Sequence, residues 1–277
     1  MEPYDKNFES IEACQTQEYN KAEKEPKLLF KYMSIDTTEK LCRFIKVFQD
    51  NRIYFPSVQE LNDSFEGTGT QLFYFDKELY DSETRKKYRV LSLSSNCFSP
   101  AMWAHYGGNR LGVCIGFYKG NHLEVNNKSH FKHAEEVKYV KSRNEFSCDE
   151  EAAIKRDLFR KHEDWIYEKE WRIIDAAKDP TLNSGQADKI DYYFEFDADD
   201  IACIIWGEKT EDAIKQLIKS VSHRIPTYTI FCDFEKYAYC IKNERTGTII
   251  FDRNTLFEDI EASKLTLGRN LETDGLY

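Results

Sequence analysis

The chain has 277 residues, of which 41% are hydrophobic and 14% aromatic, so it has ample material for a packed core. Its formal net charge of −10 argues against a protein that grips nucleic acid by bulk electrostatics, because that mode needs clustered Lys and Arg; a local basic groove is still compatible with it. No run of 18 apolar residues occurs, and residues 1–26 lack the apolar core of a signal peptide. We therefore expect no membrane span and a cytoplasmic location.

The 8 cysteines contain no C-x-x-C pair, and several lie inside apolar runs. A free Cys in such a run behaves as a small hydrophobic residue. We therefore expect reduced thiols and no zinc site.

Residues 1–26 are rich in Asp and Glu and predict a polar tail or leader helix. Asp36 resembles the N-cap of a helix that runs to about Gln49, with apolar residues at helical spacing. Ser99 and Pro100 predict the start of a short helix that ends at two glycines. In order, the first half predicts a strand at 28–33, that first helix, a strand at 51–55, a helical turn at 58–61, a charged helix within 71–88, a strand at 90–98 and a short helix at 101–106.

The second half predicts a central strand at 111–117, because this run is almost continuously apolar. The further predicted elements are a strand at 137–140, a helix at 149–161, a strand at 165–174, strands at 190–196 and 201–206, a helix at 209–221, strands at 227–232, 237–242 and 246–251, and a helix near the end. We predict an α+β fold with a mixed, mostly antiparallel central sheet and flanking helices. The expected organisation is a tail at 1–26, a single domain at 27–253, and a C-terminal helix and tail at 254–277.

The segment from Trp165 to Ile174 carries the densest set of candidate chemical groups. In a strand, side chains two residues apart share a face, so Glu168, Glu170 and Arg172 are expected to point the same way, with the two carboxylates about 7 Å apart. This face suits the stabilisation of a positive charge or the orientation of a hydroxyl group. An ordinary surface ion pair, worth about 0–1 kcal/mol, explains the same pattern.

Two other segments place polar groups where binding residues commonly occur. Asn62, Asp63 and Glu66 follow a predicted strand, although such residues also serve as turn formers. His105 and Tyr106 end the short helix before Gly107. A surface or core role explains either of these two residues equally well.

Four patches, taken together, resemble the bacterial family called domain of unknown function 2971. These patches are 30–32 with the helix that follows, 52–55 leading to 62–66, 102–106 leading to 112–117, and 165–172. Their order and spacing are similar to the family over residues 28–208. The chain departs from the family pattern at Met33, Ser64 and Arg110, where the family often has Arg, Pro and His.

The family's layout is similar to that of ADP-ribosyltransferases, and this resemblance implies that NAD is the substrate. In such enzymes the bond between nicotinamide and ribose breaks with oxocarbenium character, so a nearby carboxylate stabilises charge formed in the transition state. The resemblance implies the following roles: Glu170 as the catalytic carboxylate, Glu168 orienting the acceptor, His105 holding a ribose hydroxyl, Tyr32 and Tyr106 flanking the nicotinamide, Arg52 and Asn62 contacting the adenosine or phosphate portion, and Arg172 neutralising a phosphate or pairing with a glutamate.

Three functions are compatible with these residues. The first is an NAD-consuming ADP-ribosyltransferase or NAD glycohydrolase, such as a bacterial defence or toxin effector, with a protein or nucleic-acid acceptor. The second is a non-enzymatic module that binds a nucleotide or a partner, which exposed Glu168 and Glu170 far from His105 would favour. The third is a metal-dependent nuclease that holds Mg²⁺ with Asp63, Glu66, Glu168 and Glu170. The sequence makes no prediction of the oligomeric state.

Overall fold

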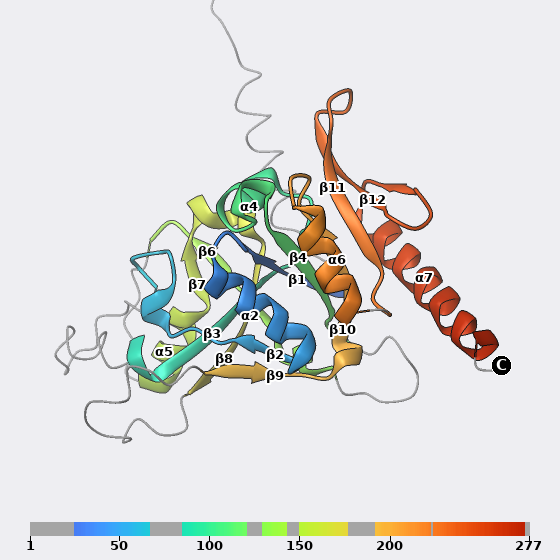
Figure 1. Cartoon of the computed structure of the whole chain (residues 1–277). Coiled ribbons are helices and arrows are strands. Elements are labelled where there is room, and N and C mark those ends of the chain that lie inside the picture. Colours follow the sequence, from blue (N-terminus) through green and yellow to red (C-terminus); the bar gives the residue numbers. More distant parts are fainter. Residues whose placement is uncertain are drawn as a thin grey trace, which may run out of the picture.

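The computed structural model describes residues 25–66, 85–120, 129–142, 150–176, 192–222 and 224–274. In this part of the chain the centre is a sheet of nine strands in the order β13-β12-β11-β10-β4-β1-β3-β8-β5 (Figure 1). Its strands are β1 (Leu28–Met33), β3 (Tyr88–Ser94), β4 (Val113–Tyr118), β5 (Glu135–Glu136), β8 (Glu170–Ala176), β10 (Ile201–Trp206), β11 (Thr227–Asp233), β12 (Ala238–Asn243) and β13 (Ile249–Ile250). Neighbours are antiparallel except β10 and β11, which run parallel. The predicted α+β fold with a mostly antiparallel sheet is confirmed.

Two small sheets and several helices surround the central sheet. Strand β2 (Arg52–Tyr54) pairs antiparallel with β9 (Tyr193–Glu195), and β6 (Lys138–Val140) pairs parallel with β7 (Arg160–His162). The helices are α2 (Thr38–Gln49), α4 (Pro100–His105), α5 (Glu150–Leu158), α6 (Asp212–Val221) and α7 (Arg253–Asp274). Short 3-10 helices are η1 (Val58–Glu60), η2 (Gly108–Arg110), η3 (His130–His133), η4 (Glu163–Glu168) and η6 (Ala198–Asp200). None of the helices in the described ranges is long and apolar enough to cross a membrane.

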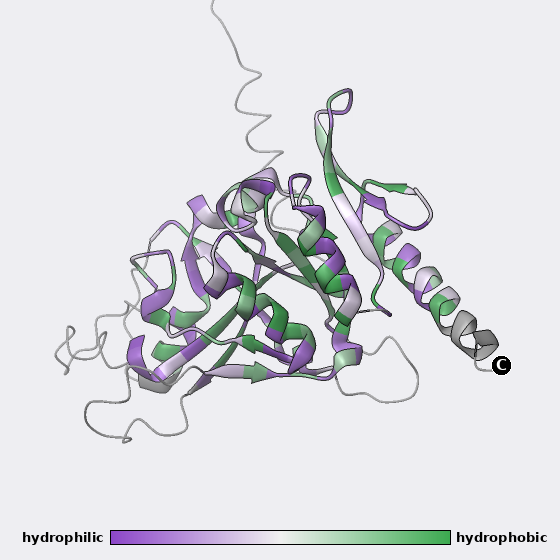
Figure 2. Cartoon of the chain, viewed as in Figure 1, coloured by the Kyte–Doolittle hydropathy of each residue, from purple (hydrophilic) through white to green (hydrophobic). Residues whose placement is uncertain are grey.

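The hydrophobic core lies on both faces of the central sheet, because its middle strands are apolar on both sides. Along β1, Leu29 belongs to the cluster beneath α2 and α6, whereas Phe30 belongs to the cluster beneath α4 and α7. Helix α2 contributes Phe44 to the first cluster, and α7 contributes Leu256 to the second. Burial of one such side chain stabilises the fold by about 1.5–3 kcal/mol. Figure 2 shows the apolar central strands between helices whose outer faces are hydrophilic.

The central sheet is split between β1 and β3. All six residues of β1 pair with β4, and all seven residues of β3 pair with β8. Between β1 and β3, in the part of the chain that the structure describes, the only backbone pair is Phe30 with Ser94. Beyond this pair, the Lys31 side chain crosses the gap and its Nζ donates to the backbone oxygen of Ser92 at 2.9 Å. The split leaves room for a cavity inside the sheet.

Two helix starts were predicted from capping residues, with different outcomes. The predicted cap of α4 is confirmed, because Ser99 accepts a hydrogen bond from the Met102 backbone N–H. The predicted Asp36 cap of α2 is wrong. Thr37 is the N-cap, and Asp36 instead accepts from Lys40 Nζ at 2.8 Å.

Two predictions around residue 165 are also wrong. The helix expected to reach Lys161 ends at Leu158, and Lys161 lies on β7. The strand expected to carry both Glu168 and Glu170 begins only at Glu170, since Glu168 ends η4 and Lys169 has the left-handed values φ 44° and ψ 54°. The left-handed residue makes the chain turn sharply between η4 and β8. Glu168 and Glu170 therefore line the same cavity although they do not lie on one strand.

The predicted tail at 1–26 and the charged helix within 71–88 lie mostly outside the described residues. Helix α7 begins at Arg253 and packs into the core through Leu256 and Ile260. The division of the chain at residues 27 and 253 stays a prediction.

Candidate functional site

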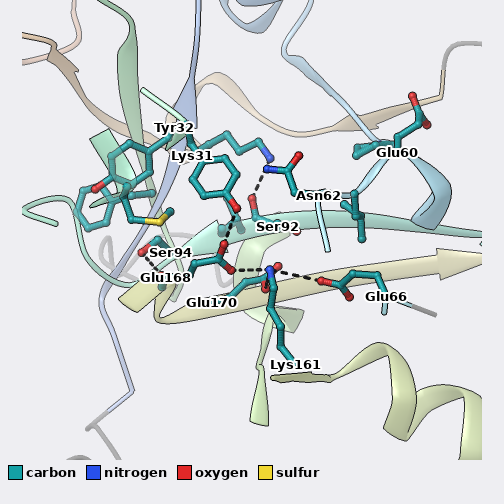
Figure 3. A pocket seen from close by; sticks show the side chains of 16 residues that line it. Lys31, Tyr32, Glu60, Asn62, Glu66, Ser92, Ser94, Lys161, Glu168 and Glu170 are labelled. Carbon is teal, nitrogen blue, oxygen red and sulfur yellow. Dashed lines mark hydrogen bonds and ion pairs between the residues drawn. The ribbon is translucent and has the colours of Figure 1, made fainter. Parts of the chain in front are cut away.

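A cavity of about 220 Å³ lies at the split between β1 and β3. It opens between these strands, η1, α4 and the end of η4, so segments far apart in sequence meet there (Figure 3). Its lining consists of the polar or charged residues Lys31, Glu60, Asn62, Glu66, Ser92, Ser94, Tyr106, Lys161, Glu168 and Glu170, with Phe30, Tyr32, Pro56, Leu61, Leu93 and Met102.

The floor of the cavity rests on the fully buried guanidinium of Arg172. Its Nε and one NH₂ group donate to the two carboxylate oxygens of Glu170, both at 2.8 Å. Its two terminal nitrogens also donate to both oxygens of Glu66, at 2.6 and 2.8 Å, and one donates to the Leu158 backbone oxygen at 2.6 Å. Two-pronged pairs of this kind are the strongest hydrogen-bonded ion pairs in proteins. Arg172 therefore ties the loop that ends at Glu66 to strand β8.

Lys161 supplies the second buried cation of the cluster. Its Nζ lies 2.6 Å from Glu168 Oε2, 3.3 Å from Glu170 Oε2 and 3.4 Å from Glu66 Oε1. Burial lowers the pKa of Lys161, but the three carboxylates outweigh burial and raise it. Lys161 is therefore a permanent cation, and it joins the three glutamates into one network.

The two neighbouring glutamates have opposite pKa shifts. Burial would raise the pKa of Glu170, but Arg172 and Lys161 outweigh it and hold this pKa at about 2. The pKa of Glu168 is raised, first by burial and then by the charge of Glu170, and together these outweigh the opposing effect of Lys161. Glu170 is therefore a fixed anion, whereas the surroundings of Glu168 disfavour its ionised form.

The backbone around Glu168 aims its side chain into the cavity. Ser94 Oγ donates to the Glu168 backbone oxygen at 2.6 Å, and the Ser95 N–H donates to the Lys169 backbone oxygen at 2.9 Å. The Tyr106 hydroxyl donates to Glu168 Oε1 at 2.5 Å, from the end of α4. Burial and the Glu168 charge both raise the pKa of Tyr106, so it remains a proton donor.

Lys31 lies at the other end of the cavity, beside Asn62 (Figure 3). Burial lowers the pKa of Lys31 to about 8, and the charge of Glu170 opposes this shift only in part. At neutral pH the ammonium is still mostly charged. The cavity therefore has an anionic end at Glu168 and a cationic end at Lys31.

The structure brings together most of the residues singled out from the sequence. Glu168, Glu170, Asn62 and Tyr106 line the cavity, as does Tyr32. The Tyr32 hydroxyl, however, donates to the Asn96 backbone oxygen, and its ring packs edge-on against Trp103, so Tyr32 is largely a core residue. Arg172 lies beneath the floor rather than in the cavity. Of its two expected roles, neutralising a phosphate or pairing with a glutamate, the structure shows the pairing with Glu170.

Two of the predicted site residues lie outside the cavity. His105 is exposed at the end of α4, with its ring 6.0 Å from that of Tyr167. Arg52, on β2, pairs with Asp50 at 2.9 Å and lies over the Tyr193 ring. Neither residue is among those that line the cavity.

Sequence reasoning missed Lys31 and Lys161, and it considered Glu66 as a loop binding residue, a turn former or a metal ligand, but not as a partner of Arg172. Lys31 had a detectable signal, because it is a single charged residue inside an otherwise apolar strand. Lys161 had none, since the sequence pattern placed it at the end of a helix. The pairing of Glu66 with Arg172 spans 106 residues and leaves no local pattern.

The four carboxylates of the nuclease hypothesis do not form a metal site. Asp63 does not line the cavity, and its Oδ1 accepts from the Phe65 N–H at 2.9 Å. Glu66, Glu168 and Glu170 are already paired with Lys161 or Arg172, which a divalent cation would have to displace. Within the described residues, no group of three or more His, Cys, Asp or Glu is arranged to hold a metal ion.

The comparison with family models confirms the family resemblance over part of the chain. The model described as "Protein of unknown function (DUF2971)" matches residues 102–173, from α4 to β8. This segment contains Tyr106, Lys161, Glu168, Glu170 and Arg172. No curated protein and no solved structure matches the chain.

Proposed function

We propose that the cavity binds the nicotinamide riboside end of NAD, and that the protein breaks the bond between nicotinamide and ribose. The observation that carries this proposal is the position of Glu168, a buried carboxylate aimed into the cavity by backbone contacts on both sides. Cleavage of this bond creates positive charge on the ribose, and a preorganised carboxylate in a buried site stabilises such charge.

Glu168 has the hydrogen-bonding capacity that this role requires. Tyr106 occupies one acceptor position on Oε1, and Lys161 occupies one on Oε2. An ionised carboxylate offers about four acceptor positions. The remaining positions are available to a ribose hydroxyl.

The charge balance of the floor also supports a cationic substrate. Three buried carboxylates, Glu66, Glu168 and Glu170, face two buried cations, Lys161 and Arg172, which leaves one negative charge. Burial is the first cause of the raised pKa of Glu168, and the neighbouring Glu170 charge is the second. The positive nicotinamide ring of NAD, and then the oxocarbenium ion, match this excess.

The two ends of the cavity suggest how NAD is oriented. Tyr106 would flank the nicotinamide beside Glu168, while Lys31 and Asn62 would meet the diphosphate. The volume of about 220 Å³ is below the range of roughly 300–1,000 Å³ typical of pockets that enclose a whole drug-sized ligand. The adenosine half would then lie outside the cavity.

This proposal gives Glu168 the catalytic role that the sequence suggested for Glu170. Glu170 is held by Arg172 and Lys161 on both of its oxygens, so a substrate would have to compete with two built-in cations. We assign Glu170 to positioning Lys161, which contacts Glu168 directly.

The acceptor of the ADP-ribosyl group would be water in a glycohydrolase and a protein or nucleic acid in a transferase. Exposed Glu168 and Glu170 far from His105 would favour the non-enzymatic alternative, but both glutamates are buried. The ADP-ribosyltransferase likeness, a role in bacterial defence and a cytoplasmic location are parts of the same proposal.

The test is calorimetric binding of NAD together with an assay of nicotinamide release. Glu168→Gln should retain NAD binding but lower the release rate roughly 100- to 1,000-fold, as expected for the loss of one contact made in the transition state. Glu60→Gln is the matched control, because Glu60 lies at the cavity but pairs with Tyr54 rather than with the cluster. If the wild type neither binds NAD nor releases nicotinamide, even with cell extract as a source of acceptors, the proposal is wrong.

A further inference from the structure

Strand β1 carries a single charged side chain, Lys31, between apolar and aromatic neighbours. This side chain is only partly exposed, and it lines the cavity beside Asn62 (Figure 3). In the part of the chain that the structure describes, its ammonium group makes one hydrogen bond, to the Ser92 backbone oxygen at 2.9 Å, and no ion pair. An ammonium group has three donors, and lysine in proteins is mostly exposed or paired. The surroundings of Lys31 therefore disfavour its charged form.

The two lysines of the cavity differ in their charge. Lys161 contacts three carboxylates, which raise its pKa, so it stays a cation. Burial lowers the pKa of Lys31 to about 8, and the charge of Glu170 opposes this shift only in part. About one tenth of the Lys31 side chains is therefore uncharged at pH 7, against roughly one in 2,500 for a lysine with the ordinary pKa near 10.4. The uncharged amine is the nucleophilic form, and burial is a usual way to activate a lysine.

A carbonyl compound is the electrophile that suits this amine. The imine that it forms becomes positively charged when it is protonated, so the reaction can retain a charge that Glu170 favours. Carbon dioxide would instead give an anionic carbamate, which the same carboxylate would repel. The floor of the cavity, where three carboxylates face two cations, also disfavours a carbonyl compound that carries a carboxylate of its own. These charges favour an uncharged aldehyde or ketone.

The size and the polar lining of the cavity narrow the class of ligand further. The volume of about 220 Å³ admits only a molecule smaller than those that fill typical pockets of roughly 300–1,000 Å³. The amide of Asn62 and the hydroxyl of Ser92 line the cavity near Lys31 and can bond to hydroxyl groups of a ligand. A short aldehyde with hydroxyl groups has the size, the charge and the hydrogen-bonding groups that this space requires.

We propose that Lys31 is a covalent binding site for a small, uncharged hydroxyaldehyde, which it holds as an imine. The neutral amine adds to the carbonyl carbon, and one electron pair of the carbonyl bond moves onto the oxygen. The bond from carbon to oxygen then breaks, and the oxygen leaves as water with the two protons that the nitrogen gives up. No oxidant or reductant is needed. This inference goes beyond the proposed function, because NAD takes no part in it, and an imine at Lys31 would occupy the place assigned to the diphosphate.

Reductive trapping of the wild-type chain tests the site. The protein is incubated at pH 7 with D-glyceraldehyde and sodium cyanoborohydride, which reduces an imine to a stable amine, and the labelled lysines are located by peptide mass spectrometry. Lys31 should be labelled roughly 10- to 100-fold faster than exposed lysines such as Lys209, because more of it is uncharged. The labelling rate at Lys31 should rise with pH and level off above about pH 8.

Lys264 is a matched control within the same chain. Its Nζ also donates to a backbone oxygen, that of Ile201 at 2.8 Å, and burial lowers its pKa, but it does not line the cavity. It should therefore be labelled more slowly than Lys31. Lys31→Arg, which keeps a positive charge but has no nucleophilic amine, should remove the label at this position and leave the labelling of Lys209 unchanged. With glyoxylate, which carries a carboxylate, the ratio of labelling at Lys31 to that at Lys209 should be smaller than with glyceraldehyde.

The outcomes separate this inference from the proposed function, because trapping is read from labelled peptides and needs no NAD. If Lys31 is labelled no faster than Lys209, if Lys264 is labelled equally, or if glyoxylate gives the same ratio as glyceraldehyde, the inference is wrong, and cleavage of NAD would still support the proposed function. If Lys31 is labelled in the expected pattern and NAD is neither bound nor cleaved, the covalent site is supported and the proposed function is wrong.

Discussion

Replacing Glu170 or Glu168 by Gln separates the structural carboxylate from the reactive one. The pKa of Glu170 is about 2 in the folded protein, against about 4.3 in an unfolded chain. Since one pKa unit corresponds to about 1.4 kcal/mol, ionised Glu170 stabilises the fold at neutral pH by about 3 kcal/mol. Glu170→Gln should therefore lower the free energy of unfolding by about 3 kcal/mol.

Glu168→Gln should behave in the opposite way. The pKa of Glu168 is raised by burial and by Glu170, so its ionised form is disfavoured by folding. A neutral amide of the same shape should change the free energy of unfolding by less than about 1 kcal/mol or should raise it. The site thus keeps a carboxylate that the fold itself does not require.

Thermal unfolding at pH 7, followed by circular dichroism, is a suitable assay. For a chain of this size, 3 kcal/mol corresponds to a Tm lower by roughly 6–12 °C. Lys141→Met is a control for the loss of an exposed ion pair, because Lys141 pairs with Glu163 and its loss should lower the free energy of unfolding by less than about 1 kcal/mol. Equal destabilisation by Glu170→Gln and Glu168→Gln would refute the division of roles.

Three further predictions concern acid stability, substrate charge and backbone packing. The stabilisation by Glu170 is complete above about pH 4.5 and should be lost as the pH falls towards 2, so the acid-unfolding curve of Glu170→Gln should be flatter than that of the wild type over this window. NAD affinity measured by calorimetry should fall as the pH rises through about 8, where Lys31 loses its charge; Lys31→Met should weaken binding roughly 10-fold at pH 7, near the low end of a charged hydrogen bond, and should abolish that pH dependence. Gly207→Ala should lower the Tm by several degrees, because its Cβ would lie 2.2 Å from the backbone oxygen of Arg110, whereas Gly120→Ala, with nothing within 4 Å, should leave the Tm unchanged.

Local patterns predicted the elements that carry the site. Ser99 and Pro100 fixed the start of α4, and therefore the place of Tyr106 near its end, because capping depends on neighbouring residues alone. The apolar run that forms β4 was recognisable for the same reason. Alternation along β8 correctly placed Glu170 and Arg172 together, since they are two residues apart on one strand.

The route by which Glu168 joins that pair was not predictable from local patterns. Lys169 adopts a left-handed conformation that lysine disfavours, and nothing in its neighbours signals it. The conformation is fixed from outside, by Ser94 and Ser95 at the end of a strand 74 residues earlier in the chain. Backbone strain of this kind is typical of sites where the surrounding fold over-determines one residue.

The buried network around Lys161 and Arg172 was hidden for a related reason. Lys161 resembles an ordinary charged residue in a charged segment, and the partners expected for Arg172 were Glu168 or Glu170. Their burial depends on Glu66, which approaches from a loop about a hundred residues earlier in the chain. A single sequence carries no pattern for such a contact, so the electrostatics of the site became visible only with the fold.

The split in the central sheet has a mechanical consequence. One backbone pair, Phe30 with Ser94, and the bond from Lys31 to Ser92 connect strands that are otherwise fully laddered to other neighbours. The sheet is therefore most compliant along the line where the cavity lies. Separating β1 from β3 would break one backbone pair and the Lys31 bond, and it would leave the two flanking ladders intact.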